Sequence, residues 1–292
     1  MEWISNKQIL IVGLGLMGGS YARRLKRLGF SVDAIDVNAD SIAYALEEGL
    51  VDRGWDHVEE QAVRQADVII FALYPGVFLQ WVKQYQHLFK PGLRMTDVTG
   101  VKAGVVYDIQ AALRPDVEFI AAHPMAGREV YGVRNSDPRM FQDANYIVVP
   151  TQKNTPEAIA WCRELGNLLG FGHIAVLSPE EHDEMIGFVS QLTHCIAVTL
   201  MTCSDNTHLV DYTGDSFRDL TRIARINETM WSELFMMNRP ALLRQMDSFL
   251  REFSQFRELL AAGDIQGMQE KMRLSTQRRA MFDKRKKGGS AT

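Results

Sequence analysis

The first half of the chain alternates short apolar runs with helix-length amphipathic stretches. The runs are apolar at nearly every position, which is typical of strands in a parallel sheet that is covered on both faces. They lie at Gln8–Gly13, Ser31–Asp36, Asp67–Leu73, Leu93–Val98, Glu118–Ala122 and Asn145–Pro150. A helical stretch over Pro156–Leu169 and a last short run over His173–Leu177 follow them. This order predicts an α/β, Rossmann-like domain with a doubly wound sheet over residues 1–177.

The pattern changes at Ser178, where the alternation of strand and helix stops. Ser178, Pro179 and Glu181 form a typical helix start. Residues 185–201 are apolar nearly all round, which indicates a helix that is buried on every side. Apolar residues then recur every three or four positions over residues 240–262. We therefore expect an all-helical domain over residues 178–292 whose apolar surface is covered by a second copy, in a homodimer.

Composition limits the kind of partner. The 292 residues are 46% hydrophobic and 23% charged, and the formal net charge is −4, which argues against nucleic acid as a main partner. Cys162, Cys195 and Cys203 have no CxxC spacing and suggest reduced thiols. Neither a signal peptide nor an apolar run of about 18 residues is evident. The chain is expected to be a cytoplasmic protein without a membrane segment.

The first apolar run leads into the sequence GLGLMGG, residues 13–19, which contains a G-x-G-x-x-G motif. The first glycine allows a tight turn, the second lets the backbone approach a pyrophosphate, and the third lets the helix pack close to the sheet. The amide groups at the start of that helix then face the phosphates. The expected cofactor contacts in this loop are Gly13, Gly15, Leu16, Met17 and Gly18.

Asp36 ends the second apolar run, 18 residues after Gly18. A carboxylate at this place binds the ribose 2′-hydroxyl and repels a 2′-phosphate, so the predicted cofactor is NAD rather than NADP. The alternative is that Asp36 only caps the next helix. No metal site is expected.

Polar residues that can carry chemistry follow the later runs. His123 comes directly after the fifth run, on the side of the sheet where ligands bind in such folds. Ser190 and His194 are four residues apart and share one helix face. Lys102, in DVTGVK, could raise the local positive potential but is more often a solvated residue. From the residues alone, His123 is as readily a histidine satisfied by local backbone as a general base.

Five motifs in this order, GLGLMGGS, DVTGVK, AHPMAGRE, SQLTH and RDLTRIA, resemble the prephenate/arogenate dehydrogenases of tyrosine biosynthesis over almost the whole chain. The resemblance implies NAD-dependent oxidative decarboxylation of prephenate to 4-hydroxyphenylpyruvate, or of arogenate to tyrosine. A base must accept the proton of the substrate's ring hydroxyl, and the ordinary histidine pKa of about 6.5 suits this task. The resemblance assigns the role to His123.

The resemblance also implies contacts to the substrate. Arg222 matches the arginine that holds a substrate carboxylate, unless it only pairs with Asp219. Ser190 and His194 match positions that line the pocket, although His194 is equally well explained as a core histidine. Glu129, near the substrate side chain, favours an amine there, as in arogenate. The alternative is that Glu129 pairs with a cation across the dimer and gates the pocket.

One position departs from the pattern of the relatives. Many of them have a serine whose hydroxyl reaches the histidine, where this chain has Gly100. We expect Thr99, or a water, to supply that hydroxyl, and we expect the charge of Arg128 to lower the pKa of His123. Two other functions stay open. A β-hydroxyacid-type dehydrogenase depends on a lysine–asparagine pair in the helical domain, and a non-catalytic NAD-binding regulator would not need His123 and Arg222 together.

Overall fold

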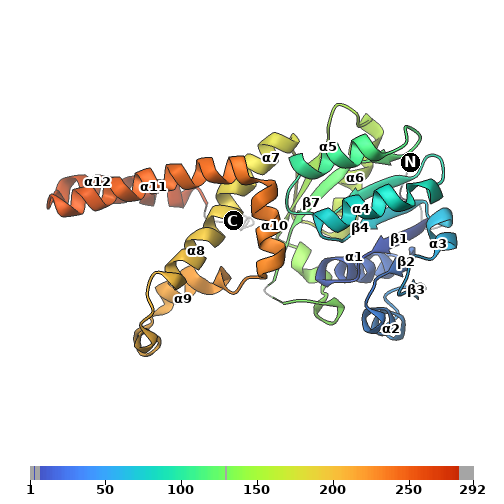
Figure 1. Cartoon of the computed structure of the whole chain (residues 1–292), viewed down its shortest axis with the longest axis horizontal. Coiled ribbons are helices and arrows are strands. Elements are labelled where there is room, and N and C mark those ends of the chain that lie inside the picture. The colour runs from blue at the N-terminus through green and yellow to red at the C-terminus, as the bar shows by residue number, and fades with distance from the viewer. Residues whose placement is uncertain (1–2, 4–6, 129, 283–292) are drawn as a thin grey trace, which may run out of the picture. The chain divides into compact units, whose positions relative to one another are not determined.

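The computed structural model describes residues 3, 7–128 and 130–282 (Figure 1). Among these residues, six parallel strands form the main sheet in the order β3-β2-β1-β4-β5-β6. Their bounds are β1 Gln8–Val12, β2 Ser31–Ile35, β3 Arg53–Trp55, β4 Val68–Phe71, β5 Arg94–Asp97 and β6 Glu118–Phe119. The apolar runs predicted these strands except β3, which has three residues and is only partly buried.

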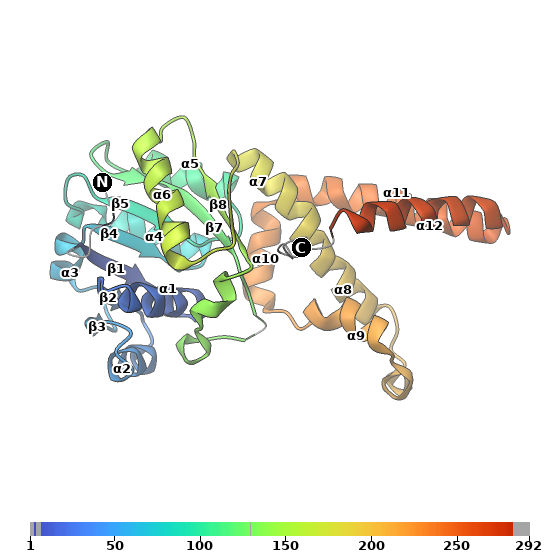
Figure 2. The same ribbon diagram turned by 180° about the vertical axis from the view of Figure 1, so that it is seen from behind.

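Helices cover both faces of the main sheet (Figure 1, Figure 2). On one face pack α1 Leu16–Arg27, α2 Ala39–Glu47 and α6 Pro156–Leu169, and on the other α3 Glu60–Gln65, α4 Pro75–Tyr85 and α5 Ala103–Ala112. Within β1, Ile9 and Ile11 join the first core, whereas Leu10 and Val12 join the second. Burial on both faces explains why the strands are apolar at every position, and the Rossmann-like fold is confirmed.

A second sheet, of three strands within the described part of the chain, carries His123. It consists of β7 Ala121–Met125, β8 Asn145–Val149 and β9 His173–Val176, with β7 antiparallel to β8 and β8 parallel to β9. We expected His123 just after a strand, and this is wrong, because β7 continues to Met125 and pairs His123 with Ile147. Pro124 is accommodated because β7 is an edge strand.

Short 3₁₀ helices and a run of longer helices complete the chain. The 3₁₀ helices are η1 Gln86–Leu88, η2 Val133–Asn135, η3 Pro138–Phe141, η5 Thr207–Tyr212 and η6 Arg222–Ala224. The longer helices after the sheets are α7 Pro179–Ile186, α8 Thr193–Thr202, α9 Asp215–Thr221, α10 Glu228–Met237, α11 Arg239–Ala261 and α12 Ile265–Ala280. The predicted start of α7 is confirmed, since Ser178 Oγ accepts from the Glu181 amide at 3.2 Å and the Glu181 carboxylate accepts from the Ser178 amide at 2.9 Å.

A π-helical turn, η4 Gly187–Leu192, joins α7 to α8. The combined helix, Pro179–Thr202, is long and apolar enough to cross a membrane, which the sequence did not lead us to expect. Three of its polar side chains, His182, Asp183 and Gln191, are nevertheless buried within the protein. We expected the helix over residues 185–201 to be buried on every side. Within a single chain this is wrong, because only 28% of the most apolar 18-residue segment of the combined helix is buried. The remaining apolar surface is open to a partner.

By compactness the chain divides into residues 1–242 and 243–292. A domain boundary at Ser178 therefore stays a prediction. Helix α7, which follows Ser178, lies within the first unit and contacts the Rossmann-like part through His182 and Asp183. In the second unit, α12 turns back after Gly263, whose φ of 67° lies in the left-handed region that favours glycine. Lys271 on α12 then pairs with Glu252 on α11, with 2.8 Å between Nζ and Oε2.

Candidate active site

The loop after β1 leaves space for a ligand where a dinucleotide fold needs it. Gly13 has a φ of 100°, and a Cβ there would lie 2.4 Å from the carbonyl oxygen of Ala72. A Cβ on Gly18 would lie 1.9 Å from the Gly13 oxygen, so only glycine fits either position. A Cβ on Gly15, in contrast, would meet nothing within 4 Å. Gly13 and Gly18 therefore serve close packing, and the backbone at Gly15 is open to a bound group.

The start of α1 is suited to an anion. No side chain caps its first amides, and its first turn, which begins with Leu16 and Met17, contains no acidic residue. These amides are available to a phosphate group. Asp36 lies at the edge of the loop, with Oδ2 accepting from the Leu14 amide at 2.5 Å and Oδ1 accepting from the Asn38 amide at 2.8 Å. The helix-cap alternative for Asp36 is wrong, because Asn38 caps α2.

A cavity of about 480 Å³ opens beside His123. Four predicted residues meet in its lining: His123 from β7, Ser190 from η4, His194 from α8 and Arg222 from η6. The cavity is also lined by Gly100, Arg128, Tyr131, Gln191, Arg225, Trp231 and Leu234. Glu129 lies outside the described residues. Among the described lining residues there is no aspartate, glutamate or lysine, so arginine sets the charge of the cavity.

His194 and Ser190 interact along their shared helix. The His194 Nδ1 atom lies 2.9 Å from the Ser190 carbonyl oxygen, and the His194 ring lies 3.8 Å, centroid to centroid, from the ring of Trp231 on α10. His194 lines the cavity and is only partly buried, whereas a core histidine would be enclosed on every side. Arg222 is exposed at the start of η6.

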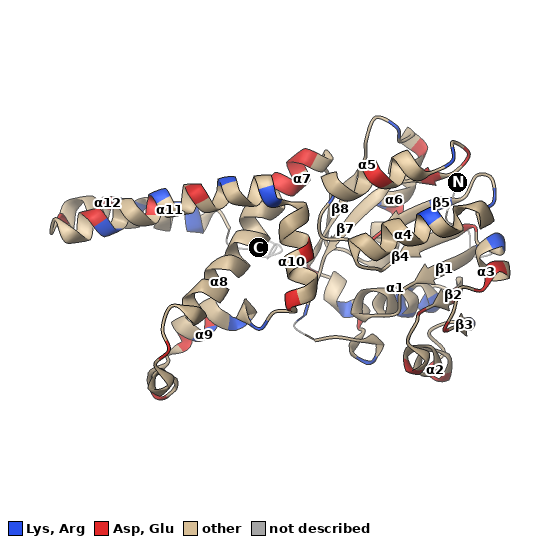
Figure 3. Ribbon diagram, viewed as in Figure 1, with Lys and Arg blue, Asp and Glu red and all other residues tan. Residues whose placement is uncertain are grey.

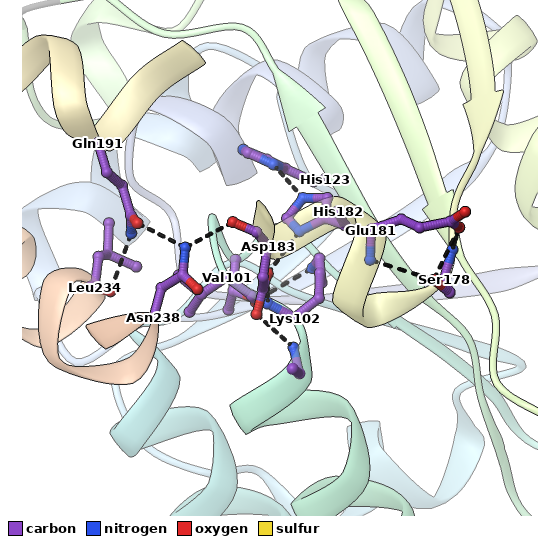
Figure 4. A network of polar contacts seen from close by, with 12 residues as sticks. Val101, Lys102, His123, Ser178, Glu181, His182, Asp183, Gln191, Leu234 and Asn238 are labelled. Atoms are coloured by element: carbon purple, nitrogen blue, oxygen red, sulfur yellow. Dashed lines mark hydrogen bonds and ion pairs between the residues drawn. The ribbon is translucent and has the colours of Figure 1, made fainter. Parts of the chain in front are cut away.

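His123 is the first member of a chain of polar contacts that the sequence did not reveal (Figure 4). Its Nδ1 atom lies 2.8 Å from Nε2 of His182, and Nδ1 of His182 lies 2.7 Å from Oδ1 of Asp183. The carboxylate only accepts hydrogen bonds, so His182 carries its proton on Nδ1. His182 Nε2 then accepts from the Nδ1–H group of His123. This assignment leaves His123 Nε2 without a proton.

The free nitrogen of His123 faces the cavity. A Cβ on Gly100 would lie 3.8 Å from His123 Nε2, and both residues line the cavity. Burial lowers the pKa of His123 well below its ordinary value of 6.5, and the electrostatic interactions of its protonated form with His182 and Lys102 lower it further. We expected Arg128 to have this effect, but the structure assigns it to His182 and Lys102. His123 is thus a neutral acceptor at pH 7.

Lys102 supports this site from below, and the expectation that it is solvated is wrong. Its side chain is fully buried, and Nζ donates to Asp97 Oδ2 and to the Ala122 carbonyl, each at 2.7 Å. Asp97 Oδ1 accepts from the Ala122 amide at 3.1 Å. Burial lowers the pKa of Lys102, and the neighbouring Asp97 carboxylate opposes this shift. The Lys102–Asp97 ion pair therefore binds both the carbonyl and the amide group of Ala122, the residue that precedes His123.

The geometry corrects the role we expected for Thr99. Its hydroxyl contacts the Asp97 carboxylate, the Val101 carbonyl at 3.0 Å and Lys102 Nζ at 3.1 Å. Thr99 is buried and does not line the cavity. It supports the ion pair and does not replace the serine hydroxyl of the relatives.

A helical spacing could have identified His182 and Asp183. The buried residues of α7 are Pro179, His182, Asp183 and Ile186, which follow the i, i+3, i+4, i+7 pattern of one helix face. Two of the four are polar, so a search for apolar stripes misses them. Arg225 gave no signal in the sequence beyond its distance of three residues from Arg222.

The chain is similar to known proteins over most of its length. Residues 21–176 match the family described as prephenate dehydrogenase, nucleotide-binding domain, and residues 178–274 match prephenate dehydrogenase, dimerization domain. The chain is 30% identical to a prephenate dehydrogenase of Bacillus subtilis over 270 residues, 89% of this chain and 72% of the relative. It is 29% identical to a cyclohexadienyl dehydrogenase of Zymomonas mobilis over 266 residues, 88% and 90% of the two chains.

Among solved structures, the chain is similar to a prephenate dehydrogenase from A. aeolicus in complex with hydroxyphenyl propionate and NAD+. The TM-score is 0.87 at 27% identity, and the match covers 97% of this chain and 100% of the other. The resemblance read from the five motifs is thereby confirmed.

Proposed function

Because the chain belongs to the prephenate dehydrogenase family, we propose that it catalyses the NAD-dependent oxidative decarboxylation of prephenate to 4-hydroxyphenylpyruvate. The observation that carries the proposal is His123, a neutral imidazole whose free Nε2 faces an arginine-lined cavity. The loop after β1 and Gly100 after β5 lie at the same edge of the parallel sheet. In such folds this edge binds the ligands.

The reaction requires a hydride to leave the ring carbon that bears the hydroxyl group. NAD supplies the hydride acceptor when it is bound. His123 Nε2 accepts the hydroxyl proton as that carbon becomes a carbonyl carbon. Loss of CO2 returns an electron pair to the ring, and the proton returns to the ring oxygen to give the phenol. The neutral form of His123 is therefore the active form.

The arginines give the cavity the charge that a dianionic substrate needs. Arg222, Arg225 and Arg128 all line it. We assign to Arg222 a carboxylate of the substrate, since a guanidinium group binds a carboxylate through two parallel hydrogen bonds. Ser190 and His194 are assigned to the same substrate as polar groups of the wall.

Two alternatives concern the substrate and the chemistry. A preference for arogenate rests on Glu129, outside the described residues, and stays a prediction. A β-hydroxyacid-type dehydrogenase would need a lysine near its substrate, and the described lining of the cavity has none. A non-catalytic regulator would not explain why His123 and Arg222 share one cavity.

We also propose that the protein is a homodimer. The family describes the matched residues 178–274 as a dimerization domain. On α11, Phe249, Leu250 and Phe253 are 37%, 56% and 63% exposed, and charged residues separate such apolar positions along α11 and α12 (Figure 3). A stripe of this kind is typical of a surface that a second copy covers. Sedimentation velocity tests the proposal, and a single species at the monomer mass of 33.1 kDa would refute it.

The cytoplasmic location, and the absence of nucleic acid and membrane partners, stay predictions. Cys162, Cys195 and Cys203 are free thiols, as expected of a reducing compartment.

The proposed function is tested by mixing the purified protein with NAD and either prephenate or L-arogenate. We expect reduced cofactor and 4-hydroxyphenylpyruvate to form in equal amounts from prephenate. His123→Asn is the matched control, which should bind NAD as the wild type does and lose turnover about 10²- to 10⁴-fold. Binding of NAD with no turnover of either substrate would refute the proposal.

A further inference from the structure

We infer that His182 and Asp183 are positioning residues that fix the tautomer and ring orientation of His123 from the other matched region of the chain. The inference deepens the proposed function and rests on it. His123 belongs to the matched residues 21–176, whereas His182 and Asp183 belong to residues 178–274. The base and the groups that orient it thus come from two regions that must pack together before the base is set.

The direction of the hydrogen bonds depends on Asp183. Its Oδ1 accepts from the Lys102 amide at 2.8 Å and its Oδ2 accepts from the Ala103 amide at 2.8 Å. These two amides and the ring nitrogen of His182 all meet the Asp183 carboxylate, which acts as the acceptor in each contact. The direction is therefore fixed from Asp183 outward, through His182 Nε2, to the Nδ1–H group of His123.

The opposite tautomer of His123 would not work as a base. It would carry its proton on Nε2, in the cavity, and present a donor where the substrate hydroxyl needs an acceptor. It would also place two unprotonated nitrogens, His123 Nδ1 and His182 Nε2, 2.8 Å apart. The contacts with His182 and Asp183 therefore disfavour the Nε2–H tautomer of His123. They also let the negative charge of Asp183 stabilise, through His182, the imidazolium that forms during the reaction.

Asp183 also connects this chain to the packing of the protein. No side chain of its own first residues caps α5, and Asp183 supplies acceptors to two amides at its start. Asn238 donates to the Asp183 carbonyl at 2.8 Å and to Gln191 Oε1 at 2.7 Å. The Asp183 carboxylate therefore caps the start of α5 and is also the last acceptor in the series of contacts that begins at His123.

The groups that face His182 come from four elements. Asp183 lies beside it on α7, His123 on β7, Lys102 before α5 and Asp97 at the end of β5. His182 itself is fully buried. Burial lowers the pKa of His182 and the Asp183 hydrogen bond opposes this, so His182 is neutral at pH 7 and able to accept from His123.

Two variants of His182 separate an orienting role from a purely structural one. In His182→Gln, the amide oxygen reaches the place of Nε2 and still accepts from His123. In His182→Asn, the shorter amide reaches Asp183 but not His123. We expect kcat/KM to fall about 10²-fold or more in His182→Asn, within the range for loss of a general base, and less than 10-fold in His182→Gln. The Kd for NAD should be unchanged in both.

The acid limb of kcat/KM against pH should move in His182→Asn and stay in place in His182→Gln. His87→Asn, an exposed histidine on η1, is the control and should match the wild type. Equal losses in the Gln and Asn variants, with the wild-type pH profile, would overturn the inference.

A second measurement reads the tautomer directly. In ¹⁵N-histidine-labelled wild type without substrate, seven histidines give signals, and His123→Asn identifies those of residue 123. We expect a protonated Nδ1 and an unprotonated Nε2, and a protonated Nε2 would overturn the inference even if His182→Asn does not fold. Wild type that shows the Nδ1–H tautomer but oxidises neither substrate would instead overturn the proposed function alone.

Discussion

Replacement of Lys102 by methionine tests the ion pair beneath the active site. Lys102 Nζ lies 2.7 Å from Asp97 Oδ2, and both side chains are fully buried. Methionine preserves most of the volume and removes the charge, so Asp97 remains as a buried carboxylate without its cation. Removal of one partner of a buried pair typically lowers the free energy of unfolding by about 3–5 kcal/mol.

We expect the lower end of that range. Asp97 still accepts from the amides of Thr99 and Ala122 and from the Thr99 hydroxyl. A loss of about 3 kcal/mol corresponds to a fall in Tm of roughly 6–12 °C for a unit of this size. Turnover should fall as well, because Nζ holds the carbonyl of the residue before His123.

Urea unfolding followed by tryptophan fluorescence measures the loss. Lys83→Met, an exposed lysine on α4, is the matched control and should change stability by no more than about 0.5 kcal/mol. Adding Asp97→Asn to Lys102→Met should restore part of the stability, because no unpaired buried charge then remains. A loss below about 1 kcal/mol in Lys102→Met would mean that the pair contributes no more than a surface pair, and would refute the reasoning.

Three further outcomes follow from the site. The acid limb of kcat/KM should lie well below pH 6.5, because the pKa of His123 is lowered and the base works in its unprotonated form above that pKa; a limb at or above pH 6.5 would contradict the neutral base. Arg222→Gln should raise KM for prephenate about 10- to 100-fold, because a charge-assisted hydrogen bond is worth about 1.5–3 kcal/mol; Arg218→Gln, which lies outside the cavity lining and pairs with Asp215, is the control, and an unchanged KM in Arg222→Gln would remove that residue from the substrate site. Asp36→Ser should raise the ratio of kcat/KM with NADP to that with NAD about tenfold, because the carboxylate that repels a 2′-phosphate is gone; an unchanged ratio would show that Asp36 does not face the ribose.

The fold could be predicted because its signals are local in the sequence. Strands buried on both faces must be apolar at every position, and a phosphate-binding turn needs glycine at Gly13 and Gly18 for steric reasons that no other residue satisfies. The site was only partly predictable. His123, Ser190, His194 and Arg222 were found through motifs, and the structure places them around one cavity.

The support of the site could not be predicted, because it depends on which polar residues the tertiary structure buries. Lys102 has the composition of a surface residue, and only the approach of Asp97 and Ala122 makes its burial tolerable. Thr99 follows a strand end as a substrate-binding residue would, but the direction of its side chain is set by the turn over residues 97–102. The same holds for His182, which the sequence did not single out, because its burial against His123 and Asp183 follows only from the tertiary structure.

The π-helical turn at Gly187–Leu192 lies between His182, which supports the base, and His194, which lines the cavity. It determines how these two side chains are oriented relative to each other around the helix axis. Such a turn accommodates one residue more than an α-helical path of the same span. Each residue of an α-helix advances the chain by about 100° around the axis, so deletion of one residue here would rotate His194 by about that angle relative to His182. A change in the length of this turn would rotate the support of the base away from the wall of the substrate cavity, whereas a substitution within it would leave their relative orientation unchanged.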